Sequence, residues 1–246
     1  FLEQLSALKA DLFLVIAIRM LPRDVWQMPE LGTFNIHGSL LPNYRGAAPI
    51  NWALINGEQK TGVTSFFINE EIDSGSLISN IEVDIADEDN AGTLHDKLMH
   101  SASSLVLETL DLISQGNANE TKQILDGEEK AAPKIYKEDC LIDWNKPGAE
   151  IHNFIRGLSP YPVAWSKLRT ESKELGQLRI YKAQFLSDVK DVEFGKVQIT
   201  KSSMFIGLKD GTLELQEIQW PGKRKMDVKS FLNGFKFEGN LSVLGN

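Results

Sequence analysis

The chain has 246 residues, 42% of them hydrophobic, and a formal net charge of −8 at pH 7, so it can bury a core and exceeds the usual ~100–200 residues of one domain. Its longest apolar run, Leu12 to Ile18, is far shorter than the ~18 residues of a membrane helix, so we expect no membrane contact. A single cysteine, Cys140, excludes an intrachain disulfide and a cysteine-rich metal site; it fits a reducing cytoplasm, and we predict no bound metal.

The sequence begins with a helix signal followed by a strand signal. Apolar residues at helical spacing follow Phe1 and lead into the run Leu12 to Ile18, which we predict to be a strand buried on both faces between parallel neighbours. We expect some of those neighbours to come from sequence that precedes Phe1. A helical segment after Pro22 and a short strand over Thr33 to His37 come next.

Helix and strand signals keep alternating through the first half. Pro49 suits the first turn of a helix that Gly57 can end, and "GVTSFFIN" reads as a strand because it is rich in β-branched and aromatic residues. A long helix with an apolar stripe is predicted from Thr93 to Gly116. The alternation predicts an α/β domain over residues 1–117, with an open, mostly parallel, Rossmann-like sheet.

The second half has a different pattern. Residues 118–133 are polar with little periodicity and are predicted to be a linker. Residues 134–246 contain a short helix near Gly148 to Leu158 and then strand-like runs, which predict a small OB-like β-barrel. Lys209 to Gly211 suits a hairpin turn, and a phase shift of the apolar residues between Leu215 and Ile218 predicts a β-bulge.

Charge is divided unevenly between the two halves. Up to Pro133 there are 8 Lys and Arg against 20 Asp and Glu, a net charge of −12; from Lys134 onward there are 18 against 14, a net charge of +4. An acidic half joined to a basic half indicates that one carries the chemistry and the other binds a polyanion. The alternative is that the lysines only decorate a solvated β surface.

One group of polar residues is typical of acyl transfer. Asn35 and His37 lie two apart on a predicted strand, so they share a face, and Asp73 lies in a loop after the next strand. An amide and a protonated imidazole can both donate to a developing oxyanion, where losing one donor costs ~10²–10³ in rate. A carboxylate can hold the imidazole or relay a proton. We find no nucleophilic side chain beside them, and a lone Asn or His at a strand end is more often a structural group than a catalytic one.

These residues resemble the folate-dependent formyltransferase family. The resemblance implies that 10-formyltetrahydrofolate donates a formyl group, that the Asn and His stabilise the tetrahedral intermediate, that the Asp assists proton transfer, and that the Ser-Leu-Leu-Pro loop lines the folate site. The matching residues are Asn35, Ile36 and His37, then Ser39, Leu40, Leu41 and Pro42, and then Asp73 within "GVTSFFINEEIDSGSLI".

Within the family, three stretches are similar to members that formylate methionyl-tRNA. They are "RGAAPI", "KIYKEDCLIDWNKPGAEIHNFIRGLSPYPVAW" and "QWPGKRKMDVKSFLNG". The resemblance implies initiator methionyl-tRNA as the acceptor, in translation initiation. It also implies tRNA contacts from Arg45 and from the basic loop of Lys223, Arg224 and Lys225, although Arg45 beside Tyr44 could equally be a packing pair.

The match covers nearly the whole chain, and two alternatives stay open. Family members carry roughly another half of the catalytic sheet before the position of Phe1, so we expect this chain to hold the C-terminal portion of the catalytic domain and to be a monomer. One alternative keeps the folate chemistry but uses a sugar nucleotide or another small amine as the acceptor. The other is a non-catalytic RNA-binding module, which would have no reason to keep Asn35, His37 and Asp73.

Overall fold

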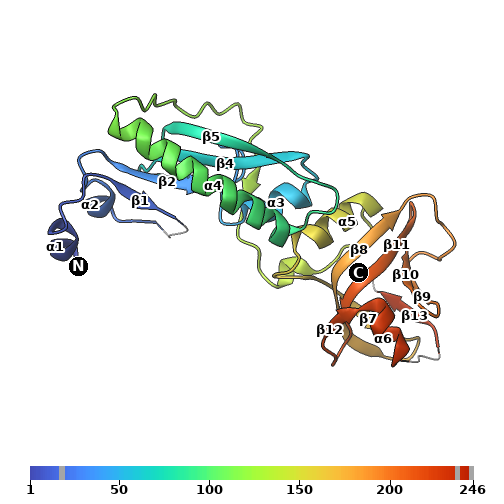
Figure 1. Ribbon diagram of the computed structural model, residues 1–246. Helices are drawn as coiled ribbons and strands as arrows, with labels where there is room; N and C mark the ends of the chain where they lie inside the picture. Colours follow the sequence, from blue (N-terminus) through green and yellow to red (C-terminus); the bar gives the residue numbers. More distant parts are fainter. Residues whose placement is uncertain (17–19, 236–238, 244–246) are drawn as a thin grey trace. The chain divides into compact units, whose positions relative to one another are not determined.

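The computed structural model describes residues 1–16, 20–235 and 239–243 (Figure 1). The chain divides into two compact units. Among the described residues, every helix is too short or too polar to span a lipid bilayer. Unit 1 comprises Phe1–Ala53, Glu58–Asp87 and Thr93–Lys134, and unit 2 comprises Leu54–Gly57, Glu88–Gly92 and Ile135–Asn246.

Unit 1 is built on a 4-stranded sheet with the order β1-β2-β4-β5. A second, two-stranded pairing joins β3 to β6. The elements of this part of the chain are α1 (Leu2–Ser6), β1 (Phe13–Val15), α2 (Arg23–Trp26), β2 (Thr33–His37), β3 (Arg45–Gly46), α3 (Pro49–Ile55), β4 (Lys60–Phe67), β5 (Leu77–Asp84), α4 (Ala91–Ser114) and β6 (Ala131–Ala132).

The described part of this sheet is mixed, whereas the sequence predicted a mostly parallel one. β1 pairs with β2 in parallel, but β2 with β4 and β4 with β5 are antiparallel. β4 and β5 are joined by a short loop, and a short loop can only join antiparallel neighbours. The α/β class stands for this unit, and its described strands do not confirm a Rossmann-like sheet.

β1 also differs from its prediction. Its only described strand neighbour is β2, and Leu14 at its centre is 39% exposed, so the strand is not buried on both faces. The apolar run therefore predicts the burial of this strand poorly, because burial depends on which elements cover each face of the sheet. The end of the predicted strand, Ala17 and Ile18, lies outside the described residues.

The two longer helices of this part agree with the sequence signals. α3 begins at Pro49, and Gly57 after it has φ +71°, the left-handed conformation of a helix end. α4 begins at Ala91 and not at Thr93, because Asn90 Oδ1 accepts the N–H of Gly92 and caps the helix earlier. The helix runs along the sheet (Figure 1), where the Ser79 hydroxyl of β5 donates to Glu108.

Unit 2 is mainly β. Its 3-10 turn and α5 precede the strands, and α6 lies between the last two. The elements are η1 (Glu138–Cys140), α5 (Gly148–Gly157), β7 (Ala164–Arg169), β8 (Glu174–Leu186), β9 (Lys196–Ile199), β10 (Met204–Gly207), β11 (Thr212–Gln219), β12 (Lys225–Asp227), α6 (Val228–Asn233) and β13 (Leu241–Val243).

The strands of unit 2 close into a barrel, as the sequence predicted. The order is β10-β9-β13-β7-β8-β11-β12, and an additional pairing of β10 with β11 closes six of them into a ring with β12 outside it. The predicted turn joins β10 to β11, because Leu208 N–H donates to Gly211 O. The predicted bulge is confirmed as well, since the register of β11 against β8 shifts between Leu215 and Ile218.

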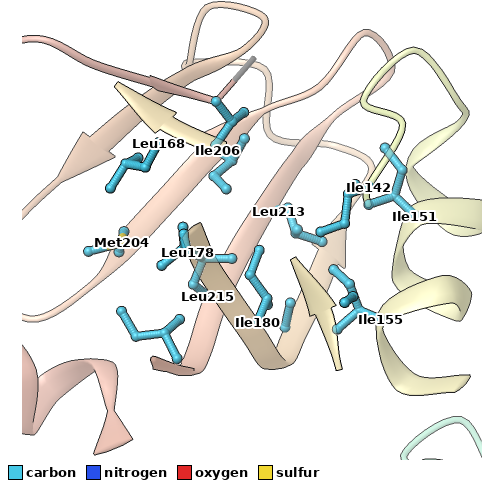
Figure 2. Close-up of a cluster of buried hydrophobic side chains, with 14 of the residues drawn as sticks. Ile142, Ile151, Ile155, Leu168, Leu178, Ile180, Met204, Ile206, Leu213 and Leu215 are labelled. Atoms are coloured by element: carbon cyan, nitrogen blue, oxygen red, sulfur yellow. The ribbon is translucent and has the colours of Figure 1, made fainter. Parts of the chain in front are cut away.

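The interior of the barrel is apolar (Figure 2). Alternate residues of β8, such as Leu178 and Ile180, point inward and are fully buried, as the period of two in a strand requires. Ile151 and Ile155 of α5, one helical turn apart, add to the same cluster. Full burial of such a side chain stabilises the fold by ~1.5–3 kcal/mol.

Candidate active site

β2 holds Asn35 and His37 in the sheet of unit 1. Asn35 pairs with Val15 of β1 on one side and with Phe66 of β4 on the other, and His37 pairs with Thr64. Asn35 Oδ1 is buried and has no hydrogen-bond partner among the described residues. Leaving a buried polar atom unpaired costs ~1–3 kcal/mol, so this oxygen is available to accept a bond from a ligand.

The imidazole of His37 has a defined proton arrangement. Its Nε2 lies 2.8 Å from the carbonyl oxygen of Tyr44. A carbonyl can only accept, so Nε2 carries a proton and donates it. Tyr44 presents this carbonyl from a backbone with φ +60°, a left-handed conformation that is uncommon outside glycine. Nδ1 is therefore the ring nitrogen that remains for proton exchange.

Asp73, from the loop between β4 and β5, lies beside that nitrogen. Its Oδ2 is 3.8 Å from His37 Nδ1 and accepts a 3.0 Å hydrogen bond from the N–H of Gly46. The two side chains are only 8% and 13% exposed. A separation of 3.8 Å exceeds a direct hydrogen bond, so a proton on Nδ1 stays available to a third group. The structure thus brings His37 and Asp73 together; no hydrogen bond joins Asn35 Oδ1 to either.

The backbone of the Asp73 loop is tightly constrained. Asp73 itself has φ +51°. A side chain at Gly75 would place its Cβ 1.6 Å from the carbonyl oxygen of Phe67, so only glycine fits there. Phe67 N–H also donates to Ser76 O at 2.9 Å, which closes the loop where β4 ends. The sequence predicted that Asp73 lies in a loop, but it did not predict the left-handed backbone conformation of this residue.

The 118–133 segment, predicted as a linker, contacts the loops of the site. Its β6 pairs in parallel with β3, and Thr121 forms an isolated bridge with Leu77. Gln123 donates through Nε2 to the carbonyls of Asp73 (2.9 Å) and Gly75 (2.8 Å). Sequence reasoning missed Gln123, because a polar residue in a stretch without periodicity gives no signal of tertiary contact.

Lys130 and Glu58 fix the loop that carries Tyr44. The Tyr44 hydroxyl and the Lys130 ammonium both donate to Glu58 Oε1. Burial raises the pKa of the Glu58 carboxyl, but the hydrogen bonds from Lys130 and Tyr44 outweigh it and leave the pKa lowered. Lys130 N–H also donates to Asn43 Oδ1 at 3.0 Å. The carbonyl that orients His37 is therefore held from both sides of its loop.

The predicted folate loop, Ser39 to Pro42, is anchored to β4. Ser39 is fully buried; its hydroxyl donates to Asn43 O at 2.6 Å, and its carbonyl accepts from the Thr64 hydroxyl at 2.6 Å. Leu41 N–H donates to the same hydroxyl at 3.2 Å. The Leu40 side chain lies against Gly62, where an added Cβ would come within 2.5 Å of it. Folate contact by Ser39, Leu40, Leu41 and Pro42 stays a prediction.

Arg45, predicted to contact tRNA, is bound to Gln123. Its Nε and Nη2 lie 3.1 Å and 2.5 Å from Gln123 Oε1. A guanidinium has five donors, so further donors remain for a ligand. A tRNA contact from Arg45 therefore stays a prediction that this pairing allows.

The predicted basic loop is the tip of the β11–β12 hairpin in unit 2. Gly222 has φ +73° and Lys223 N–H donates to Trp220 O, so a tight turn joins β11 to β12. Lys223 and Arg224 are exposed. Lys225 already pairs with Glu217 at 3.0 Å and lies 4.4 Å from the centre of the Tyr181 ring.

Two family models match the chain, one in each half. The model of the family described as "Formyl transferase" matches residues 1–110, and "Formyl transferase, C-terminal domain" matches residues 134–236. A methionyl-tRNA formyltransferase of Flavobacterium johnsoniae is 51% identical over 99% of this chain and 77% of its own length.

Solved structures share the fold. The crystal structure of HypX from Aquifex aeolicus in complex with tetrahydrofolic acid aligns with a TM-score of 0.69 and 21% identity, over 97% of this chain and 44% of that one. The sugar 3N-formyl transferase WlaRD aligns with a TM-score of 0.65 and 19% identity, over 89% and 77%. The family models and the identity to the Flavobacterium relative establish that the chain belongs to the formyltransferase family.

Proposed function

We propose that the protein transfers the formyl group of 10-formyltetrahydrofolate to the α-amine of initiator methionyl-tRNA, in the cytoplasm where translation starts. The observation that supports the chemistry is the placement of His37 Nδ1 3.8 Å from Asp73 Oδ2, on the strand that also carries the unpaired Oδ1 of Asn35. The acceptor follows from the 51% identity to a methionyl-tRNA formyltransferase. A sugar acceptor is less supported, because the solved sugar formyltransferases are 19% to 28% identical to this chain.

The residues present fit a formyl group under transfer. Asn35 Oδ1 is buried and has no hydrogen-bond partner among the described residues, so it can accept from the attacking amine while the NH₂ of the same side chain donates to the formyl oxygen. 10-Formyltetrahydrofolate supplies an electrophilic formyl carbon. The amine of an aminoacyl ester has a pKa below the ~7.7–8.0 of a free α-amine, so much of it is neutral near pH 7.

His37 and Asp73 then handle charge and protons. In its protonated form, His37 donates from Nδ1 to the formyl oxygen as that oxygen becomes negative, while its Nε2–H stays bonded to the Tyr44 carbonyl. Asp73, beside Nδ1, takes up through a bridging water the proton that the amine loses on bonding to the formyl carbon. That proton is returned to the folate nitrogen as its bond to the formyl carbon breaks. The amine attacks directly, so no nucleophilic side chain is required.

The catalytic assignment is tested by Asn35→Ala, His37→Ala and Asp73→Ala in the full-length protein. We expect each to lower the rate of formyl transfer to methionyl-tRNA by ~10²-fold or more, because each removes a group that acts in the transition state. tRNA binding should hardly change. Wild-type rates in all three variants would refute the assignment. Measuring formyl transfer to methionyl-tRNA and to an amino-sugar nucleotide side by side tests the identity of the acceptor. Transfer to the sugar alone would refute methionyl-tRNA as the acceptor.

Contact between tRNA phosphates and the hairpin tip is the second part of the proposal. Lys223 and Arg224 are exposed at the tip, whereas the ammonium of Lys225 is already paired with Glu217. We therefore assign most of the contact to the first two, with Lys225 shaping the hairpin. Each phosphate contact releases a counterion and steepens the dependence of affinity on salt by about one unit of slope.

A salt titration of tRNA binding tests this contact. Neutralising Lys223 and Arg224 to Gln should reduce the slope of log affinity against log salt by about two. The matched control neutralises Lys190 and Lys201, exposed lysines elsewhere in the same unit, and changes the net charge equally. An equal effect of the two pairs would mean that only overall charge matters and would remove the hairpin from the interface.

A further inference from the structure

Gln123 links the two loops that hold the polar groups of the site. Its carboxamide oxygen accepts from Arg45, which precedes Gly46, the donor to the Asp73 carboxylate. Its carboxamide nitrogen donates to the carbonyls of Asp73 and Gly75. The side chain thus lies between the start of β3 and the loop after β4, and it comes from a third segment of the chain.

The carboxamide of Gln123 can adopt only one orientation here. Such a group has two donor hydrogens and two acceptor positions on its oxygen, and all four are used. A guanidinium only donates and carbonyls only accept. Turning the amide over would therefore place its NH₂ against the Arg45 donors and its oxygen against the two carbonyls. Lys122 and Ile124 beside it are exposed, so Gln123 is the inward-facing residue of this stretch.

These bonds fall on a strained piece of backbone. Asp73 has φ +51°, a conformation that costs a non-glycine residue ~1–3 kcal/mol unless the surroundings hold it. Gln123 binds the carbonyl of Asp73 and that of Gly75, the two that flank Ser74. Fixing both carbonyls fixes the direction in which the Asp73 side chain leaves the loop and hence its distance from His37.

We propose that Gln123 is a positioning residue for Asp73, an inference that rests on the proposed function. Its hydrogen bonds go to Arg45 and to the carbonyls of Asp73 and Gly75, so it acts by holding the backbone that carries the carboxylate of Asp73. Through Arg45 it also ties the loop after β2 to the loop after β4. Misplacement of a reacting group by ~1 Å can cost ~10²-fold in rate, which sets the size of the expected effect.

The first test compares Gln123→Ala, Gln123→Glu and the control Ile124→Ala in the full-length protein, using formyl transfer to methionyl-tRNA. Gln123→Glu keeps an acceptor for Arg45 but lacks the two hydrogens that hold the carbonyls. We expect both Gln123 variants to lower kcat by ~10- to 100-fold with KM nearly unchanged, and the control to match the wild type. Wild-type kcat in Gln123→Glu would overturn the proposal, because the residue would then serve only Arg45.

The second test is a double-mutant cycle with Asp73→Asn. If Gln123 acts through Asp73, adding Gln123→Ala to Asp73→Asn should cost little further rate, since non-additivity marks residues that act together. An equal fold-loss in both backgrounds would overturn the inference. A wild-type protein inactive on methionyl-tRNA would instead refute the proposed function, so the two failures are distinct.

Discussion

Replacing Gly75 by alanine tests how the Asp73 loop is held. The added Cβ would stand 1.6 Å from the carbonyl oxygen of Phe67 and 2.8 Å from its carbonyl carbon. Both atoms belong to the backbone at the end of β4, so no side-chain rotation can relieve the clash. The backbone itself has to move.

The size of that movement follows from the geometry. Real Cβ atoms essentially never come closer than 3.0 Å, so the two backbones must separate by about 1.4 Å, the difference between 3.0 and 1.6 Å. Such a shift strains the bond from Phe67 N–H to Ser76 O and moves Asp73, two residues away, from His37. Overpacking of this kind costs ~1–3 kcal/mol of stability, and a displacement of ~1 Å in a reacting group costs ~10²-fold in rate.

The assay measures kcat for formyl transfer and the free energy of unfolding in urea for Gly75→Ala in the full-length protein. Gly234→Ala is the control, because its added Cβ would meet no atom of the described residues within 4 Å and its φ of −110° suits alanine. We expect a loss of both activity and stability at Gly75 and neither at Gly234. A Gly75→Ala protein with wild-type kcat would refute the claim that this backbone contact sets the position of Asp73.

Other predictions concern charge, reactivity and capping. Glu58 has a lowered pKa, so its contribution to stability is present above the unfolded pKa of about 4.5 and is lost as the pH falls through the lower, folded value. In urea melts, Glu58→Gln should therefore lower the free energy of unfolding near neutral pH, and this difference from the wild type should disappear as the pH falls below 4.5 through the folded value. Burial raises the pKa of the Cys140 thiol to about 11, so iodoacetamide should alkylate the native protein slowly near neutral pH and the unfolded protein fast; rapid native alkylation would contradict this. Asp210 accepts the Gly148 N–H at the start of α5, and Asp210→Ala should cost ~0.5–2 kcal/mol in urea melts, with Asp191→Ala, an exposed aspartate, as a neutral control.

The features of the fold that could be predicted are those encoded locally. The turn at Lys209 to Gly211 and the bulge between Leu215 and Ile218 follow from a few adjacent residues, and both are present. Strand direction in unit 1 could not be read in this way, because an apolar run such as Leu12 to Ile18 does not specify its partners or what covers its faces. Pairing between distant segments decides both, and the described sheet is mixed.

The candidate site shows the same limit. The period of two in a strand predicts that Asn35 and His37 share a face, since it depends only on backbone geometry. The approach of Asp73 to His37 depends on left-handed backbone at two positions and on contacts from residues that are remote in sequence. Gln123 is 50 positions from Asp73 along the chain, and no local pattern links them.

A rigid strand and supported loops make different contributions to this site. β2 is paired with β1 as far as Asn35 and with β4 as far as His37, so the backbone of both residues is fixed by the pairing that holds the sheet together. Asp73 depends on a few hydrogen bonds to its side chain and its loop, each worth a net ~0.5–1.5 kcal/mol. Substitutions at exposed or half-buried positions such as Gln123 should therefore lower catalysis well before they unfold the protein, whereas substitutions within β2 should affect both together. A positioning contact is therefore recognised by a loss of catalysis without a loss of stability, and a structural contact by the loss of both.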